Sequence, residues 1–388
     1  MRVAMVTESF LPTLNGVTTS VCRVAQSLRA LGHEALILAP GPAPATFEGF
    51  AVRGLPSVTV RQFPTGVPTP ALRHALEDFE PDVVHAASPF VLGARALQLA
   101  DRTGTPAVAI YQTDMPSYLQ QHGRGRMGAS AASAAWRWIR RMHAHADLTL
   151  APSTQTLDEL RRHGVPRTEL WARGVDTGLF SPHWRTDPGT AELRRALAPS
   201  GEVLLGYVGR LAPEKELWRL TEVAQIPGTR LVIVGDGPSR AQVGARLTEA
   251  VASMPGRPNC SPAFLGRRSG DDLARAYAAF DVFVHTGTRE TFGQTLQEAA
   301  AVGLPVVAPG RGGPLDIVEH GRTGLLFDPD TPGSLHDHVD ALVGDAAWRA
   351  TLGHDAELAV RGRSWESLTE QLVGHYDTAR ASRALRVA

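Results

Sequence analysis

The chain has 388 residues, and its 39 Lys and Arg balance its 39 Asp and Glu, so the overall charge does not suggest a nucleic-acid partner or a strongly acidic substrate. Its length favours two domains. Two distant cysteines, Cys22 and Cys260, lack metal-ligand spacing and indicate a reducing compartment without a disulfide framework. The N-terminus has no signal-peptide core and no apolar run is long enough for a membrane span, which predicts a soluble cytoplasmic protein.

The first half of the chain alternates strand-like and helix-like segments. RVAMVTES favours a buried strand, residues 17–31 a helix that ends at Gly32, and HEALILAP the next strand. Further strands are predicted at residues 82–85, 107–112 and 148–152. This pattern of strand, helix and strand predicts an open parallel sheet.

The pattern loosens after Asp176, through TGLFSPHWRTDPGT, and starts again at Val203. Strands are then predicted at residues 203–208, 230–234, 261–265, 282–285 and 305–308. We therefore expect two Rossmann-like domains, residues 1–180 and 181–365, followed by a C-terminal segment, residues 366–388. The last helix carries apolar residues at helical spacing, and this periodicity leaves open which domain it packs on, including a crossing back to the first.

The most informative stretch is HTGTRETFGQTLQE, residues 285–298. Its loop opens a helix whose unpaired backbone N–H groups favour a phosphate. Glu290 on the loop and Glu298, expected about two turns into the helix, can each accept hydrogen bonds from vicinal hydroxyl groups. The stretch follows the strand-like DVFVH, so it lies where doubly wound sheets bind ligands. It predicts a nucleotide-sugar site, the alternative being two solvated glutamates.

Two further segments suit a diphosphate. Asn15-Gly16-Val17 follows the first strand, and Gly16 lets a ligand approach the backbone, although a turn with positive φ explains it equally well. GYVGRLAPEK carries Arg210 and Lys215, which can neutralise a leaving diphosphate as a metal ion does elsewhere; the alternative is a solvated loop. Neither a GxxxxGK[ST] loop nor GxGxxG occurs, which argues against classical ATPases and dehydrogenases.

Four residues are candidates for binding a second substrate. His85 and the Gln112-Thr113-Asp114 segment end predicted strands of the first domain, and Asp176 lies in RGVD near the linker. Two alternatives are structural: His85 as a buried, hydrogen-bonded histidine, and Asp176 as the cap of a turn.

One amphipathic segment, residues 135–146, has two predicted helical faces. One face carries Trp138, Ile139, Met142 and Ala146, and the other carries Arg137, Arg140 and Arg141. Such a segment either touches an anionic membrane surface or packs on its own domain with a solvated basic face.

Five segments together carry a family resemblance: Asn15-Gly16-Val17, GRLAPEK, VIVGDGP, Phe264-Leu265-Gly266 and the Glu-x7-Glu element from Glu290 to Glu298. In this order they resemble the retaining family-4 glycosyltransferases of the GT-B fold. The resemblance spans nearly the whole chain. It implies an acceptor-binding first domain and a second domain that binds the nucleotide-sugar donor.

The resemblance also implies residue roles. Gly16, Arg210 and Lys215 would bind the diphosphate, Glu298 the ribose, and Glu290 the hydroxyl groups of the donor sugar. The remaining donor-binding residues would be Phe264, Leu265 and Gly266 at the base, and the amides of Phe292, Gly293, Gln294 and Thr295 around the sugar and its phosphate. Catalysis would rest on Glu290, Arg210 and Lys215, in a front-face reaction where the leaving phosphate helps to deprotonate the incoming hydroxyl.

One position departs from the family pattern: many relatives have a titrating histidine where this chain has Gln112. The segments TESFLPTLNGVTTSV, YQTDMPSYL and RGVDTGLF are most similar to bacterial GDP-mannose-dependent α-mannosyltransferases that extend glycolipids. Sulfoquinovosyl-diacylglycerol synthases share many of these sequence motifs. The base and the sugar therefore stay open at this point.

Taken together, the resemblance implies a cytoplasmic, metal-independent, retaining hexosyltransferase without a cofactor. It would move mannose from GDP-mannose to a glycolipid hydroxyl, with peripheral contact at the inner membrane face. The alternatives are a transferase for a UDP-sugar (sulfoquinovosyl or glucosyl), an epimerase of the same fold, a soluble acceptor, or an inactive subunit that only binds sugar nucleotides.

Overall fold

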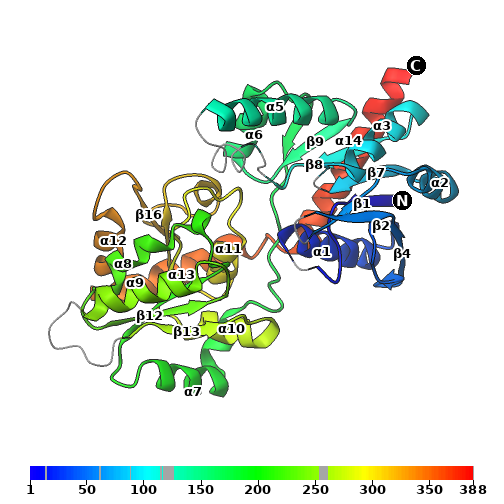
Figure 1. Ribbon diagram of the computed structural model, residues 1–388. Helices are drawn as coiled ribbons and strands as arrows, with labels where there is room; N and C mark the ends of the chain where they lie inside the picture. Colours follow the sequence, from blue (N-terminus) through cyan, green and yellow to red (C-terminus); the bar gives the residue numbers. More distant parts are fainter. Residues whose placement is uncertain are drawn as a thin grey trace. The chain divides into compact units, whose positions relative to one another are not determined.

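The computed structural model describes residues 1–13, 15–60, 63–87, 89–113, 116, 126–252 and 261–387. The chain divides into two compact units (Figure 1). The first unit contains Met1–Gly174 and Trp365–Ala388, and the second contains Val175–Ser364. Both expected boundaries therefore shift by a few residues. Residues 175–180 belong to the second unit and not to the first, and Trp365 belongs to the first unit and not to the second.

The first unit is built on a sheet with the strand order β10-β9-β8-β7-β1-β2-β4-β3. Its strands pair in parallel, except that the edge strand β3 is antiparallel to β4. The strands are β1 (Arg2–Thr7), β2 (Glu34–Pro40), β3 (Thr46–Phe47), β4 (Phe50–Leu55), β7 (Val83–Ala87), β8 (Ala107–Ile110), β9 (Leu148–Ala151) and β10 (Thr168–Leu170). A separate hairpin joins β5 (Ser57–Val60) and β6 (Phe63–Gly66).

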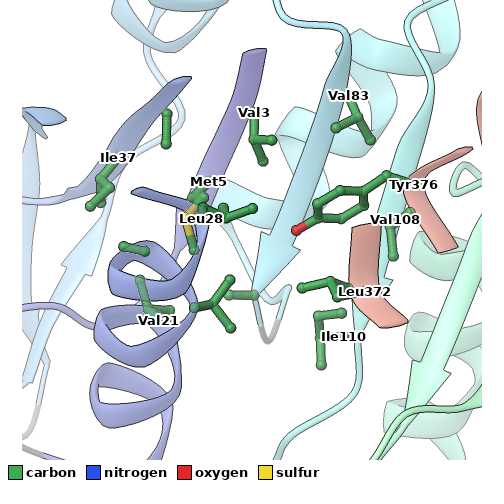
Figure 2. Close-up of a cluster of buried hydrophobic side chains, with 14 of the residues drawn as sticks. Val3, Met5, Val21, Leu28, Ile37, Val83, Val108, Ile110, Leu372 and Tyr376 are labelled. Carbon is green, nitrogen blue, oxygen red and sulfur yellow. The ribbon is translucent and has the colours of Figure 1, made fainter. Parts of the chain in front are cut away.

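Helices cover both faces of this sheet, because its central strands are continuous apolar runs. The helices are α1 (Gly16–Ala30), α2 (Pro70–Phe79), α3 (Leu92–Thr103), α5 (Arg126–His143), α6 (Thr154–Arg162) and α14 (Trp365–Val387). Val3 and Met5 of β1 face a cluster that includes Val21 of α1 with Leu372 and Tyr376 of α14 (Figure 2). The last helix therefore packs on the first unit, which periodicity left undecided.

The second unit has a sheet of parallel strands in the order β13-β12-β11-β14-β15-β16. They are β11 (Val203–Val208), β12 (Thr229–Val234), β13 (Ala263–Gly266), β14 (Val282–Val284), β15 (Val306–Pro309) and β16 (Gly324–Phe327). The prediction of two Rossmann-like parallel sheets is confirmed, although the sequence did not predict the short β16. Because β11 lies between β12 and β14, the strand order reverses there, and ligands bind at such switch points.

The helices of the second unit are α7 (Pro188–Leu197), α8 (Leu220–Ala224), α9 (Arg240–Ala252), α10 (Gly270–Ala279), α11 (Gln294–Ala301), α12 (Ser334–Gly344) and α13 (Ala346–Val360). Short 3₁₀ turns occupy η1 (Pro182–Thr186), η2 (Pro213–Lys215), η3 (Leu217–Arg219) and η4 (Gly313–Asp316). One face of the sheet packs Leu205 and Ile233 against Val243 of α9 and Leu335 of α12. The buried strands hold the loops at their carboxyl ends in place.

Helix α5 corrects the predicted amphipathic face. Trp138 is 43% exposed and belongs with Arg137 and Arg141 to the solvent-exposed residues of the helix. Trp136 is buried instead and stacks on His163 with ring centroids 3.9 Å apart. Across the part of the chain that the structure describes, no helix combines the length and the apolar character needed to cross a bilayer.

Candidate functional site

Three loops interlock at the carboxyl ends of β11, β12 and β13. The Gly209 N–H donates to Val234 O at 3.0 Å, and the Gly235 N–H donates to Gly266 O at 2.8 Å. Gly235 has a φ of 134°, and a Cβ there would lie 1.9 Å from Gly209 O, so only glycine fits. The expected base-side residue Gly266 is thereby joined through Gly235 to the loop that carries Arg210.

Lys215 and Arg210 each have a carboxylate partner of their own. Lys215 Nζ lies 2.6 Å from Glu290 Oε2, and both side chains are largely buried, at 24% and 18% exposed. Arg210 pairs with Glu214, and its side chain is 62% exposed. The sequence did not predict the Lys215–Glu290 pair, because the two residues lie on loops that follow different strands.

The loop after β14 is fastened to the Lys215 loop by side-chain hydrogen bonds. Thr286 Oγ1 donates to Lys215 O at 2.7 Å, and Thr288 Oγ1 donates to the Glu216 carboxylate. These contacts hold the backbones of the two loops together at the switch point between β11 and β14. Such cross-links between loops favour a preorganised site.

His285 is a neighbour of this ion pair that the sequence did not single out. Its Nε2 lies 3.6 Å from Glu290 Oε2, and the side chain is 2% exposed. Burial lowers the pKa of His285 to about 4. The charge of Glu290 and the nearby Gly287 backbone oppose this shift, and the charge of Lys215 adds to it. The imidazole is therefore neutral at pH 7.

Glu298 lies on α11 and is held from α10. The Tyr277 hydroxyl donates to Glu298 Oε2 at 2.7 Å, and Tyr277 is fully buried. Burial first, and then the charge of Glu298, raise the pKa of Tyr277 well above its usual value, so the hydroxyl stays protonated. Because α11 begins at Gln294, Glu298 lies just over one turn into the helix, rather than the expected two.

The N-terminus of α11 follows Gly293, which has a φ of 105° and provides no side-chain cap. The preceding residue Phe292 is 2% exposed, and the loop is fixed where Gly313 N–H donates to Glu290 O at 2.7 Å. A Cβ on Gly313 would lie 2.1 Å from Phe292 O, so this close packing also requires glycine. The predicted amide group, Phe292 to Thr295, thus lies at a helix N-terminus that favours anions.

Phe264 packs against α9. The Arg240 guanidinium lies 4.9 Å from the Phe264 ring centroid, and a Cβ on Gly244 of α9 would lie 3.8 Å from the ring. Phe264, Leu265 and Gly266 are all partly buried in β13. Of the three, Gly266 is the one whose backbone contacts the Gly235 loop.

In the first unit, Gly16, Gln112 and Arg173 come together. Gly16 begins α1, which Asn15 caps by accepting hydrogen bonds at 3.0 Å from the N–H groups of Val17 and Thr18. Gly16 does not have positive φ, so that alternative is wrong. A Cβ on Gly16 would lie 3.3 Å from Arg173 Nη1, and Arg173 Nη2 donates to Gln112 Oε1 at 2.7 Å.

His85 lies inside its strand, which corrects its expected position at the strand end and matches the structural alternative of a buried, hydrogen-bonded histidine. It lies within β7, is 2% exposed, and its Nδ1 is 2.6 Å from the Tyr376 hydroxyl of α14. Burial lowers the pKa of His85 to about 3. Asp176 accepts a hydrogen bond from Leu179 N–H at 2.9 Å, as a turn cap does. Asp114 lies outside the described residues, as does Ser88.

Glu8 is a further polar residue that the sequence did not indicate. Its Oε1 accepts hydrogen bonds from the N–H groups of Phe90, Val91 and Gly93 at 2.7–2.9 Å, where α3 begins. Burial raises the pKa of Glu8, and these hydrogen bonds oppose the rise.

Within the residues that the structure describes, no group of three or more His, Cys, Asp or Glu is arranged to hold a metal ion.

Comparisons with known proteins agree with this architecture. Residues 14–179 match Glycosyltransferase Family 4, and residues 190–358 match Glycosyl transferases group 1. The chain is 44% identical to a GDP-mannose-dependent alpha-mannosyltransferase of Mycobacterium tuberculosis, covering 100% of this chain and 99% of that protein. It is 43% identical to the protein of the same name from Mycolicibacterium smegmatis, over 100% of both.

Among solved structures, Anabaena Alr3699/HepE in complex with UDP has a TM-score of 0.77 at 20% identity. The match covers 97% of this chain and 100% of that one, and it supports the GT-B fold expected from the sequence. The relatives that match over their full length show that the chain is a hexosyltransferase. The chain therefore belongs to the family 4 glycosyltransferases.

Proposed function

We propose that this enzyme transfers mannose from GDP-mannose to an acceptor hydroxyl with retention of the α configuration. The observation that carries the proposal is the Lys215–Glu290 pair, which lies with the Tyr277–Glu298 pair around the N-terminus of α11. The cation and the helix N-terminus suit a diphosphate, and the two carboxylates suit the hydroxyl groups of the two sugars on either side of it. The names of the full-length relatives support mannose and guanine.

Each group has a proposed role in binding the donor. Lys215, Arg210 and the amides from Phe292 to Thr295 bind the diphosphate, and Gly16 approaches it through its backbone N–H. Glu298 accepts the ribose hydroxyl groups and is oriented for this by Tyr277. Glu290 binds the mannose hydroxyl groups, and Gln112 with Asp114 binds the acceptor. The residues at the border of the base are those of β13: Phe264, Leu265 and Gly266.

The proposed chemistry needs charge stabilisation more than a protein nucleophile. The bond between mannose C1 and the phosphate oxygen breaks, and a bond from C1 to the acceptor oxygen forms on the same face. The acceptor proton passes to the departing phosphate oxygen. Lys215 and Arg210 neutralise the charge that develops on this leaving group, so we expect transfer without a divalent cation. Glu290 holds the sugar in a reactive orientation.

We further propose a glycolipid acceptor and peripheral contact with an anionic membrane. The support is the exposed side of α5, where Trp138 lies among Arg137, Arg140 and Arg141. Tryptophan prefers the interface and arginine the anionic headgroups. Trp138→Ala should weaken binding to vesicles that contain an anionic lipid, measured by sedimentation, and Trp218→Ala, at an exposed tryptophan of the second unit, is the matched control.

Calorimetric titration of GDP, UDP and ADP, with and without magnesium, tests the donor assignment. We expect GDP to bind most tightly and magnesium to have little effect. The anomeric configuration of the transferred mannose, read by NMR, then tests retention. Preference for UDP would contradict the guanine assignment, and activity that EDTA abolishes would contradict metal independence.

A further inference from the structure

The buried imidazole of His285 is not explained by packing. Its backbone N–H donates to Val307 O at 2.8 Å, which fixes the residue at the end of β14. Among the described residues neither of its ring nitrogens has a hydrogen-bond partner at normal geometry, although the Gly287 backbone lies near enough to favour the charged ring slightly. Leaving a buried polar group unpaired costs about 1–3 kcal/mol. A leucine would fill a purely structural position without that cost, so the ring suggests a role in another state of the site.

The carboxylate of the ion pair lies beside the ring. Glu290 Oε2 lies 2.6 Å from Lys215 Nζ and 3.6 Å from His285 Nε2. One carboxylate oxygen thus faces two nitrogen groups, but only the lysine is within hydrogen-bond distance. The same oxygen can bind the histidine after a displacement of less than about 1 Å.

The surrounding backbone limits what can move. Thr286 Oγ1 holds the Lys215 carbonyl at 2.7 Å, and a Cβ on Gly287 would lie 3.5 Å from Lys215 Cα. The two loops are therefore in close contact at their main chains. A ligand that attracts Lys215 displaces the flexible end of the side chain and leaves His285 and the Glu290 backbone where they are.

We propose that His285 is a positioning residue that binds Glu290 when Lys215 turns to the diphosphate of the donor. This inference rests on the proposed function, since it requires Lys215 to bind the diphosphate. A neutral imidazole with its hydrogen on Nε2 donates to the carboxylate. Glu290 then receives a hydrogen bond from the imidazole in place of the one from the lysine, which keeps its carboxylate charged and oriented.

A double-mutant cycle on GDP affinity tests the exchange of partners. His285→Leu should weaken GDP binding about ten- to hundredfold, the value of a hydrogen bond to a charged group. In a Glu290→Gln background the same change should have little effect, because the charged acceptor of the imidazole hydrogen bond is gone. His285→Gln places an amide N–H near the position of Nε2 and should restore most of the affinity.

Thermal unfolding separates this role from a structural one. His285→Leu removes an unpaired polar group, so its Tm should equal or exceed that of the wild type. The control is His143→Leu in the first unit, where Nδ1 lies 3.1 Å from Thr149 Oγ1. That variant should lose stability and keep its GDP affinity.

Two results separate the inference from the function on which it rests. If the wild type binds GDP and His285→Leu binds it equally well, or loses the same factor with and without Glu290, the exchange of partners is refuted and the proposed function stands. If the wild type binds no GDP, the proposed function fails and the inference fails with it.

Discussion

Tyr277→Phe should weaken nucleotide binding without disturbing the fold. The Tyr277 hydroxyl donates to Glu298 Oε2 at 2.7 Å and is fully buried, so the change removes one hydrogen bond to a carboxylate. Such a bond contributes about 1.5–3 kcal/mol, which corresponds to about a ten- to hundredfold loss of GDP affinity. The ring itself is kept, with its contacts to Phe180 at 5.6 Å and Phe283 at 5.6 Å between centroids.

The assay compares GDP with 2′,3′-dideoxy-GDP by calorimetry. If Tyr277 acts by orienting Glu298 toward the ribose, the variant should lose affinity for GDP and lose little for the dideoxy compound. Tyr376→Phe is the matched control, because its buried hydroxyl bonds to His85 in the first unit. An equal loss for both nucleotides, or no loss, would refute the role assigned to Tyr277.

Three further predictions concern the same fold. Glu290→Ala should reduce kcat by at least about a hundredfold while GDP still binds, whereas Lys215→Ala should weaken GDP itself; equal losses of affinity in both would contradict these roles. Burial lowers the pKa of His143 to about 4, whereas the unfolded chain titrates there near 6.5. The free energy of unfolding should therefore fall as the pH drops from about 6.5 to 4. Guanidinium unfolding of His143→Leu should show a shallower fall of this free energy over the same pH range. Arg383→Met removes one of the two cations that contact the buried Asp147, the other being Arg386, and should lower the free energy of unfolding by about 1.5–3 kcal/mol. An unchanged unfolding midpoint would count against this anchor of α14.

The sequence determined the architecture and the segment that carries the site. Buried strands such as RVAMVT are continuous apolar runs, and helices follow them at helical spacing, so both parallel sheets could be predicted. The Glu290 to Glu298 element was found because it follows a strand at the edge where such sheets bind ligands. These features depend on local pattern and chain order, which a sequence contains directly.

The tertiary structure decided which side chains meet. Lys215 and Glu290 lie on the loops after β11 and β14, which are neighbours in the sheet although β12 and β13 lie between them in the chain. The sequence suggested that His85 ends a strand, yet it lies in the middle of β7 and is hydrogen-bonded to Tyr376 of α14. Periodicity placed Trp138 in the core, and the structure buries Trp136 instead. Spacing along one segment does not reveal its partner, because contacts between segments depend on strand order and on which helix covers which face.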